Sequence, residues 1–163
     1  MAKPKTPSGS EITMTELVLP SHTNALGTIF GGVVMSWIDI AGASAAMKHA
    51  RSVVVTASID ALNFVAPIRL GALVTLKARV NAVHRSSMEV GVRVDSENPL
   101  TGESCHNATA YLTFVALDSD RKPTPVHSLS LVTAEDQRRA HEALKRREFR
   151  QKLRDSLKEG AGA

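Results

Sequence analysis

The chain has 163 residues, of which 43% are hydrophobic and 22% charged, with 10 glycines and 7 prolines. This composition is typical of a globular protein of one domain, and it excludes a chain that is disordered throughout. The formal net charge is +4, but the excess lies mainly after Thr133, where nine basic residues accompany six acidic ones, so we expect no nucleic-acid partner.

The first ten residues are small, polar and rich in proline, which predicts a flexible N-terminus. They lack the apolar run of a signal peptide, so we expect a cytoplasmic protein. Residues 11–19 could form a first strand, and clustered Pro, Ser, Asn and Gly predict a loop at residues 20–28. Residues 33–50 are rich in Ala, Met and Ile and contain no proline, which predicts a helix of about five turns.

This helix is apolar on nearly every side, a pattern typical of a buried helix. The longest stretch here that is both uncharged and apolar, residues 27–38, has twelve residues before Asp39. A bilayer requires about twenty, so we expect no membrane association.

After the helix the period of the apolar positions changes from 3.6 to 2. Residues 53–65 are rich in β-branched side chains, and residues 74–82 and 88–94 alternate between apolar and polar, which predicts three strands. A turn at residues 98–102 separates them from a last long strand at residues 104–117.

A polar loop then leads to Thr133, a residue type that caps helices, and two acidic residues suit the first turn of a helix that runs to about Lys158. Its apolar positions are sparse, so we expect it to lie on a surface or project toward a partner chain. The predicted organisation is a flexible N-terminus at residues 1–10, one folded domain at residues 11–118, a linker at residues 119–132, and a charged C-terminal helix and tail at residues 133–163.

The order of one strand, a buried helix and four long strands predicts an α+β fold in which a single antiparallel sheet covers one helix. Such a sheet has a small core and two open edges. Pairing of these edges between copies would extend the sheet and cover them, so we expect at least a dimer.

Asp39 is the only charged residue between Gly31 and Met47. A carboxylate within an apolar helix loses hydration worth several kcal/mol unless it is paired. A structural bond to a backbone amide or an arginine would explain its presence, and so would a role as general base or nucleophile.

Gly31 and Gly32 stand at the entrance of the helix, where backbone N–H groups can approach a ligand and the helix dipole is positive. They could bind a developing oxyanion or form a tight turn with positive φ. Asn24 supplies a donor and an acceptor, although a loop asparagine often only builds a turn. The combination with Asp39 favours a functional site.

The pattern Asn-x2-Gly-x3-Gly-Gly-x2-Met-x-Trp-Ile-Asp over residues 24–39 resembles the signature of the hot-dog-fold acyl-CoA thioesterases, in particular the branch of YciA and the cytosolic acyl-CoA hydrolases. Further matches at residues 55–68, Gly71 and residues 85–90 extend the resemblance over residues 11–118. It implies a hot-dog fold, a long antiparallel sheet wrapped around one central helix, here with an added C-terminal helix. It also implies hydrolysis of the thioester of fatty acyl-CoA to a free fatty acid and coenzyme A.

The resemblance further implies that Asp39 activates water or attacks the carbonyl, and that Asn24 holds the water or the thioester across a dimer interface. The N–H of Gly31 or Gly32 would bind the thioester oxygen. The dimer would be the minimal active unit, and the usual assembly of the family is a trimer of dimers, a homohexamer. Coenzyme A carries phosphates that need cations and backbone donors, for which the candidates are Arg85, Ser86, Ser87 and Arg69.

The single cysteine, Cys105, excludes an internal disulfide and a CxxC zinc site. The chain has no HExxH, GKS/T or GxGxxG pattern, so we expect no metal and no cofactor beyond the coenzyme A of the substrate. Two alternatives remain: an acyl-CoA binding or sensing protein without catalysis on the same fold, and a hot-dog dehydratase. A dehydratase needs a histidine beside its carboxylate, and the helix has only His49, ten residues after Asp39.

Overall fold

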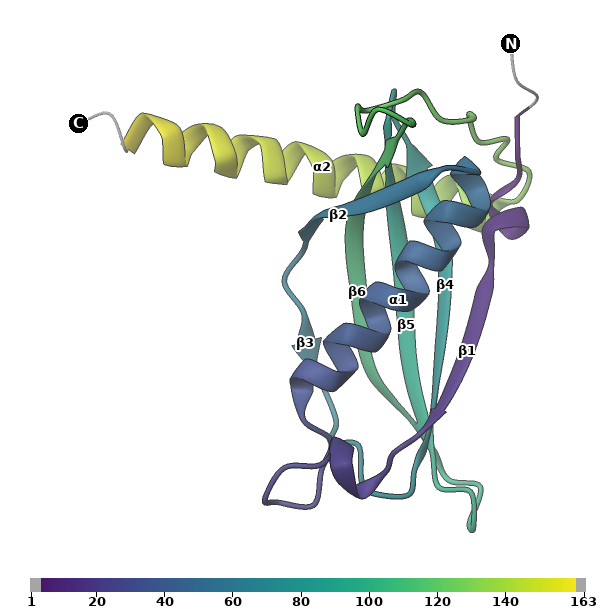
Figure 1. The fold of residues 1–163 in the computed structure, drawn as a ribbon, viewed down its shortest axis with the longest axis vertical. Helices are drawn as coiled ribbons and strands as arrows, with labels where there is room; N and C mark the ends of the chain where they lie inside the picture. The colour runs from purple at the N-terminus through teal and green to yellow at the C-terminus, as the bar shows by residue number, and fades with distance from the viewer. Residues whose placement is uncertain (1–3, 161–163) are drawn as a thin grey trace.

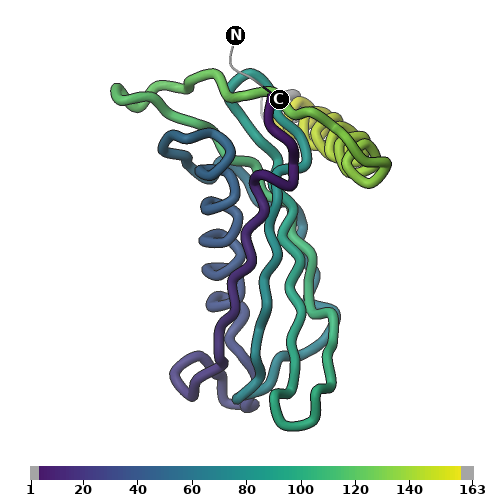
Figure 2. Tube along the Cα trace, turned by 90° about the vertical axis from the view of Figure 1, so that its right-hand side faces the viewer, coloured from purple at the N-terminus to yellow at the C-terminus, as the bar shows by residue number. Residues whose placement is uncertain are grey.

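A computed structural model describes residues 4–160 of the chain. Its strands form one antiparallel sheet in the order β1-β4-β5-β6-β2, and the short β3 also pairs with β6. The long helix α1 lies on one face of this sheet and α2 on the opposite face, near one end (Figures 1 and 2). The predicted α+β arrangement around one central helix is confirmed. The elements are β1 (Ile12–Leu17), α1 (Gly31–Ala50), β2 (Val53–Ile59), β3 (Asn63–Phe64), β4 (Leu73–Val83), β5 (Ser87–Glu97), β6 (Ser104–Leu117) and α2 (Ala134–Gly160), with short 3-10 turns at Pro7–Ser10 and Pro20–His22.

One side of α1 is packed against the sheet, and the other side is open. Val34, Ile38 and Ala45, which follow one another at spacings of four and seven residues, are completely buried. On the open side, Met35 is 44% exposed and Ile40 is 51% exposed. The prediction of a helix buried on nearly every side is therefore wrong for a single chain, because the sheet covers only one of its sides.

Gly42 allows α1 to approach the sheet closely. A Cβ atom at this position would lie 3.0 Å from the ring of Phe114 on β6 and 3.6 Å from Val92 on β5. The fully buried ring of Phe114 therefore fills the space where a larger helix residue would stand.

The strands β4, β5 and β6 form where they were predicted and the apolar positions predicted on β4 and β5 are buried, but the predicted alternation fails at Asn81 on β4 and Glu89 on β5, which are buried as well. The predicted strand at residues 53–65 is divided. It forms β2 and β3, with a register shift between Thr56 and Ser58. Because β2 pairs only with β6, its other edge is open among the described residues. Val53 and Val55 on this edge strand are 64% and 44% exposed.

The N-terminal residues that the structure describes are bound to the domain. The amide of Lys5 donates to the carbonyl oxygen of Ser128 over 3.0 Å. The buried hydroxyl of Ser10 donates to the carbonyl oxygen of Pro7 and accepts from the amide of Val80 on β4. The prediction of a flexible N-terminus is thus wrong for residues 4–10, and residues 1–3 lie outside the described part.

The helix α2 begins as predicted. The hydroxyl of Thr133 accepts a hydrogen bond of 3.0 Å from the amide of Asp136, and the carboxylate of Asp136 accepts one from the amide of Thr133, a reciprocal cap. The same carboxylate binds Arg79 on β4, which attaches the start of the helix to the sheet. Within residues 4–160, neither helix combines the length and apolar character needed to cross a membrane.

Candidate active site

Asp39 lies on the open side of α1 and is partly exposed. Its Oδ1 accepts a hydrogen bond of 2.7 Å from the hydroxyl of Thr56 on β2. Within residues 4–160, the ion pairs involve other carboxylates, so Asp39 is not held by an arginine of its own chain. The carboxylate keeps free lone pairs toward solvent, which suits a group that takes a proton or attacks a carbon.

Thr56 was not selected from the sequence. It lies within the segment 55–68 that resembles the thioesterases, but a threonine in a strand needs no explanation of its own. Its importance is visible only in the folded structure, where α1 packs against β2 and brings Asp39 to Thr56.

Asn24 builds the loop that leads to α1. Its Oδ1 accepts hydrogen bonds from the amides of Leu26 (2.9 Å) and Thr28 (3.4 Å), and its Nδ2 donates to the hydroxyl of Thr28 (3.1 Å). Gly27 completes the turn with a φ of +71°, which a residue with a side chain rarely adopts. Asn24 makes no contact of this kind with Asp39 within the described chain, so these two predicted residues are not brought together by one copy.

Gly31 and Gly32 form the first positions of α1 and do not have positive φ, so the alternative of a tight turn is wrong. A Cβ at Gly32 would lie 2.5 Å from the ring of Phe30. Neither amide has an acceptor among residues 4–160, because the first turn of a helix has no preceding carbonyl groups. Two N–H groups at the positive end of the dipole are thus available to an anion.

The residues proposed to bind coenzyme A fall into two groups at opposite ends of the sheet. Arg69 pairs through its backbone with Thr28, beside the Asn24 loop. Arg85 and Ser86 form the turn between β4 and β5, and Ser87 begins β5. The intervening β4 has eleven residues, so the two groups are about 36 Å apart along the strand. One chain does not unite them.

His49 is removed from Asp39 and is buried near the end of α1. Its Nε2 lies 2.8 Å from the carbonyl oxygen of His127. Burial lowers the pKa of His49, and the hydrogen bond to His127 opposes this shift. A histidine in this position does not face the carboxylate as a dehydratase would require. Over residues 4–160, no group of three or more His, Cys, Asp or Glu side chains is arranged to hold a metal ion.

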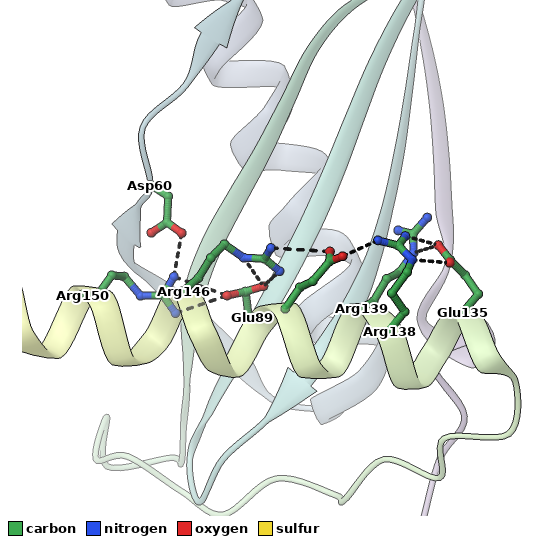
Figure 3. Close-up of polar contacts among 8 residues, drawn as sticks. Asp60, Glu89, Glu135, Arg138, Arg139, Arg146 and Arg150 are labelled. Atoms are coloured by element: carbon green, nitrogen blue, oxygen red, sulfur yellow. Dashed lines mark hydrogen bonds and ion pairs between the residues drawn. The ribbon is translucent and has the colours of Figure 1, made fainter.

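A cluster of ion pairs attaches α2 to the sheet (Figure 3). Glu89 on β5, whose side chain is 3% exposed, binds Arg146 over 2.6 Å and Arg150 over 3.2 Å. Arg150 also binds Asp60 over 2.6 Å, in the segment between β2 and β3. Burial raises the pKa of Asp60, and Arg150 opposes this shift. The cluster therefore holds the segment that follows Thr56.

A cavity of about 570 Å³ lies between the end of β4, residues 125–131 and α2, away from the open side of α1. Arg85 and the buried Asn81 are among its lining residues, and both amide atoms of Asn81 lack a hydrogen-bond partner in the described chain. Neither Asp39 nor Asn24 lines it.

Comparison with known proteins shows where this arrangement recurs. The family model described as the thioesterase superfamily matches residues 26–103. A protein of Bacillus subtilis strain 168, named uncharacterized acyl-CoA thioester hydrolase YkhA, is 41% identical over 155 residues, which cover 91% of this chain and 90% of that protein.

Two solved structures share the fold over nearly their whole length. A hexameric acyl-CoA thioesterase in its apo form is 44% identical with a TM-score of 0.90, and the match covers 93% of this chain and 97% of that one. An acyl-CoA hydrolase from Staphylococcus aureus, solved with butyryl coenzyme A, coenzyme A and coenzyme A disulfide, is 36% identical with a TM-score of 0.88 and 96% coverage of both chains. Structures of its variants, in which an aspartate, a threonine or an asparagine is replaced by alanine, have TM-scores of 0.88, 0.85 and 0.90.

Proposed function

The chain belongs to the thioesterase superfamily, and from this membership and the geometry of its site we propose that it is an acyl-CoA thioester hydrolase. Water adds to the acyl carbon, the carbon–sulfur bond breaks, and a free fatty acid and coenzyme A leave. The hydrogen bond from Thr56 to Asp39 is the observation that carries the assignment of the catalytic group, because it orients a partly exposed carboxylate on the open side of α1.

Asp39 activates the water or attacks the carbonyl itself. With Oδ1 held by Thr56, the other carboxylate oxygen is directed away from this contact and toward the substrate. A carboxylate positioned in this way contributes to catalysis as a general base or as a nucleophile. The relative from S. aureus has variants of an aspartate and a threonine, the two residue types that meet here.

The amides of Gly31 and Gly32 bind the thioester oxygen as negative charge develops on it. They are the free donors at the start of α1, and a pre-organised donor of this kind contributes about 3–4 kcal/mol to acyl transfer. The absence of a side chain at Gly31 lets the substrate approach the backbone, whereas at Gly32 it makes room for the ring of Phe30.

Asn24 contributes its amide from a second copy. In one chain its Oδ1 is committed to the loop, whereas Nδ2 has one hydrogen left after its bond to Thr28. That donor would hold the water or the thioester oxygen beside Asp39 of the partner. The dimer is then the minimal active unit.

The coenzyme A moiety lies between the two groups of cations. Pairing of antiparallel edges reverses the long axis of one copy relative to the other, which places the Arg85 end of one beside the Arg69 end of its partner. Arg69 and Arg85 then supply charge for the phosphates, and the hydroxyls of Ser86 and Ser87 supply donors.

We propose a homo-oligomer built from such dimers, as a trimer of dimers. The acyl-CoA thioesterase that is 44% identical to this chain is a hexamer, which supports this assembly. The reaction itself needs no metal and no cofactor, because a carboxylate and backbone amides supply both the base and the anion site. Removal of metal ions by EDTA should leave the rate of thiol release unchanged. A location in the cytoplasm stays a prediction.

The test is release of free thiol from acyl-CoA of a series of chain lengths by the wild-type protein and by Asp39→Asn. We expect hydrolysis by the wild type and a loss in kcat of about 1,000-fold in Asp39→Asn, since the variant keeps the shape of the side chain but not its basicity. Asp120→Asn, a change of an exposed loop residue, is the matched control and should retain the wild-type rate.

A wild-type protein that binds acyl-CoA at every chain length without releasing thiol would instead be a binding or sensing module. A rate in Asp39→Asn close to that of the wild type would remove this residue from the mechanism. Circular dichroism of the variant confirms that its fold is retained.

A further inference from the structure

One stripe of residues runs along α2 at alternating spacings of three and four. Because an α-helix has 3.6 residues per turn, positions with this spacing lie on the same side. The stripe consists of Ala143, Arg146, Arg150, Leu153 and Leu157.

The first half of the stripe faces the sheet of its own chain. Ala143 is 1% exposed, and Arg146 and Arg150 bind Glu89 on β5. The guanidinium of Arg146 also stacks on the ring of Tyr111 at 3.5 Å from the centroid. Since Leu153 and Leu157 continue this stripe, their side chains are directed to the same side as these anchored arginines.

The second half of the stripe has no sheet beneath it. Arg150 reaches Asp60, between β2 and β3 at the edge of the sheet, and residues 151–158 are all exposed. Figure 1 shows α2 continuing past this edge. Leu153 and Leu157 are 51% and 66% exposed.

Residues 151–158, which we call the overhang of α2, are long enough to cover a small part of a sheet. Its eight residues extend about 12 Å at 1.5 Å per residue. Neighbouring strands are about 4.8 Å apart, so the overhang covers about two strands placed beyond the edge.

We propose that the overhang of α2 docks on the outer face of a second copy of this chain, one that joins the sheet at the open edge of β2. Such a copy continues the sheet beneath Leu153 and Leu157, beyond the edge at which the sheet of their own chain ends. The exposed Val53 and Val55 make the same edge apolar, so the overhang and the strand edge form one continuous surface. Under two-fold symmetry each α2 covers its partner.

This inference rests on the homo-oligomer of the proposed function and adds the segment that crosses between copies. It gives the C-terminal helix a defined task. The anchored half of α2 fixes the segment after Thr56 through Asp60, and the overhang ties that same segment to the neighbouring copy.

The test compares Leu153→Lys/Leu157→Lys with the wild type by light scattering and sedimentation over a range of protein concentrations. We expect dissociation toward monomers, with the concentration of half-dissociation at least about tenfold higher, because charges are then placed in an apolar contact. Leu153→Met/Leu157→Met is the control and should associate like the wild type, because methionine keeps the apolar surface of the overhang.

Association of the lysine variant equal to that of the wild type would overturn the proposal. So would a hexamer that separates into intact dimers, since the overhang would then lie between dimers, and so would a monomeric wild type. Both leucines are exposed in the single chain, so circular dichroism should show an unchanged fold in every variant.

Thiol release by the wild type, measured separately, distinguishes this inference from the proposed function. A protein that hydrolyses no acyl-CoA but dissociates when the leucines are replaced keeps the docking surface and loses the enzymatic assignment. A monomer that hydrolyses acyl-CoA would confirm the enzymatic assignment and overturn the docking surface.

Discussion

At the scale of single residues, the site depends on how a short hydroxyl side chain constrains a carboxylate. Asp39 is partly exposed and has two equivalent oxygens, so without a partner its side chain would sample several orientations. The hydroxyl of Thr56 donates a hydrogen bond of 2.7 Å to one oxygen and thereby favours one orientation of the carboxylate. In the proposed mechanism, Thr56 thus positions the reacting group without undergoing chemistry itself.

Replacement of Thr56 by valine keeps the volume and removes the hydrogen bond. A hydrogen bond to a charged group contributes about 2 kcal/mol, which corresponds to a loss of roughly thirtyfold in kcat. We expect Thr56→Ser to retain most of the rate and KM to change little in both variants, as measured by steady-state thiol release. Thr75→Val is the control, because the hydroxyl of Thr75 pairs with Thr15 between β1 and β4. An unchanged kcat in Thr56→Val would exclude the positioning role.

The sequence alone could select Asp39 because a single charge contrasts with the apolar helix around it. Thr56 gives no such contrast, and its partner is 17 positions away on another element. Asn24 was correctly recognised as a loop residue, but whether its amide also serves chemistry depends on a second copy. A residue that stands out against its neighbours can be found in one sequence, whereas a contact between elements cannot.

At the scale of elements, α2 is held by charges that are distant in the sequence. Arg146 and Arg150 meet Glu89 about 60 positions away, and Asp136 meets Arg79. The cap at Thr133 was predictable from local sequence, but these long-range pairs were not. The same distinction explains why the bounds of β6 agree with the prediction, while the binding of residues 4–10 through Ser10 was missed.

The cap of α2 makes the stability of the protein depend on pH. Burial would raise the pKa of Asp136, but hydrogen bonds from the backbone of Thr133 and from Arg79 outweigh it and lower the pKa below its usual value of 3.8. A carboxylate whose pKa is lowered in the folded state stabilises the fold above its unfolded pKa. This contribution is lost as the pH falls through the folded pKa.

We therefore expect Asp136→Asn to reduce the free energy of unfolding by about 2 kcal/mol at neutral pH. The difference from the wild type should become smaller below the unfolded pKa of 3.8, where the wild-type carboxylate also becomes protonated. Urea denaturation over a series of pH values measures both. Asp155→Asn, whose side chain is 65% exposed on the same helix, should have little effect at any pH. A difference that stays constant with pH would contradict the electrostatic explanation.

At the scale of the whole molecule, a single chain has all the predicted groups but does not assemble them. Asn24 and Asp39 do not meet, and Arg69 and Arg85 lie at opposite ends of the long β4. In the proposed dimer, a second copy completes the arrangement at the open side of α1 and the open edge of β2. This convergence depends on quaternary structure, which a pattern of residues along one chain does not contain.

A shared site can be tested by mixing two inactive variants. Asn24→Asp keeps the Oδ1 acceptor that the loop needs and removes the amide donor, and Asp39→Asn removes the carboxylate. After the subunits exchange, half of the dimers are mixed and each has one intact site of two, so about a quarter of the wild-type rate should return. No recovery of thiol release would mean that both residues of a site come from one chain. Each variant exchanged with itself is the control.

The position of β2 in the sheet also has a consequence for the order of biosynthesis. Strands β4, β5 and β6 pair with their neighbours as they emerge, but β2 precedes its partner and cannot pair until β6 is made, with Val53 opposite Leu117. Joining them requires closure of a loop of about 60 residues, which is slower than forming a hairpin. The edge strand through which we expect copies to join is thus among the last strands to pair. A nascent chain therefore cannot associate through this edge before its own sheet is complete.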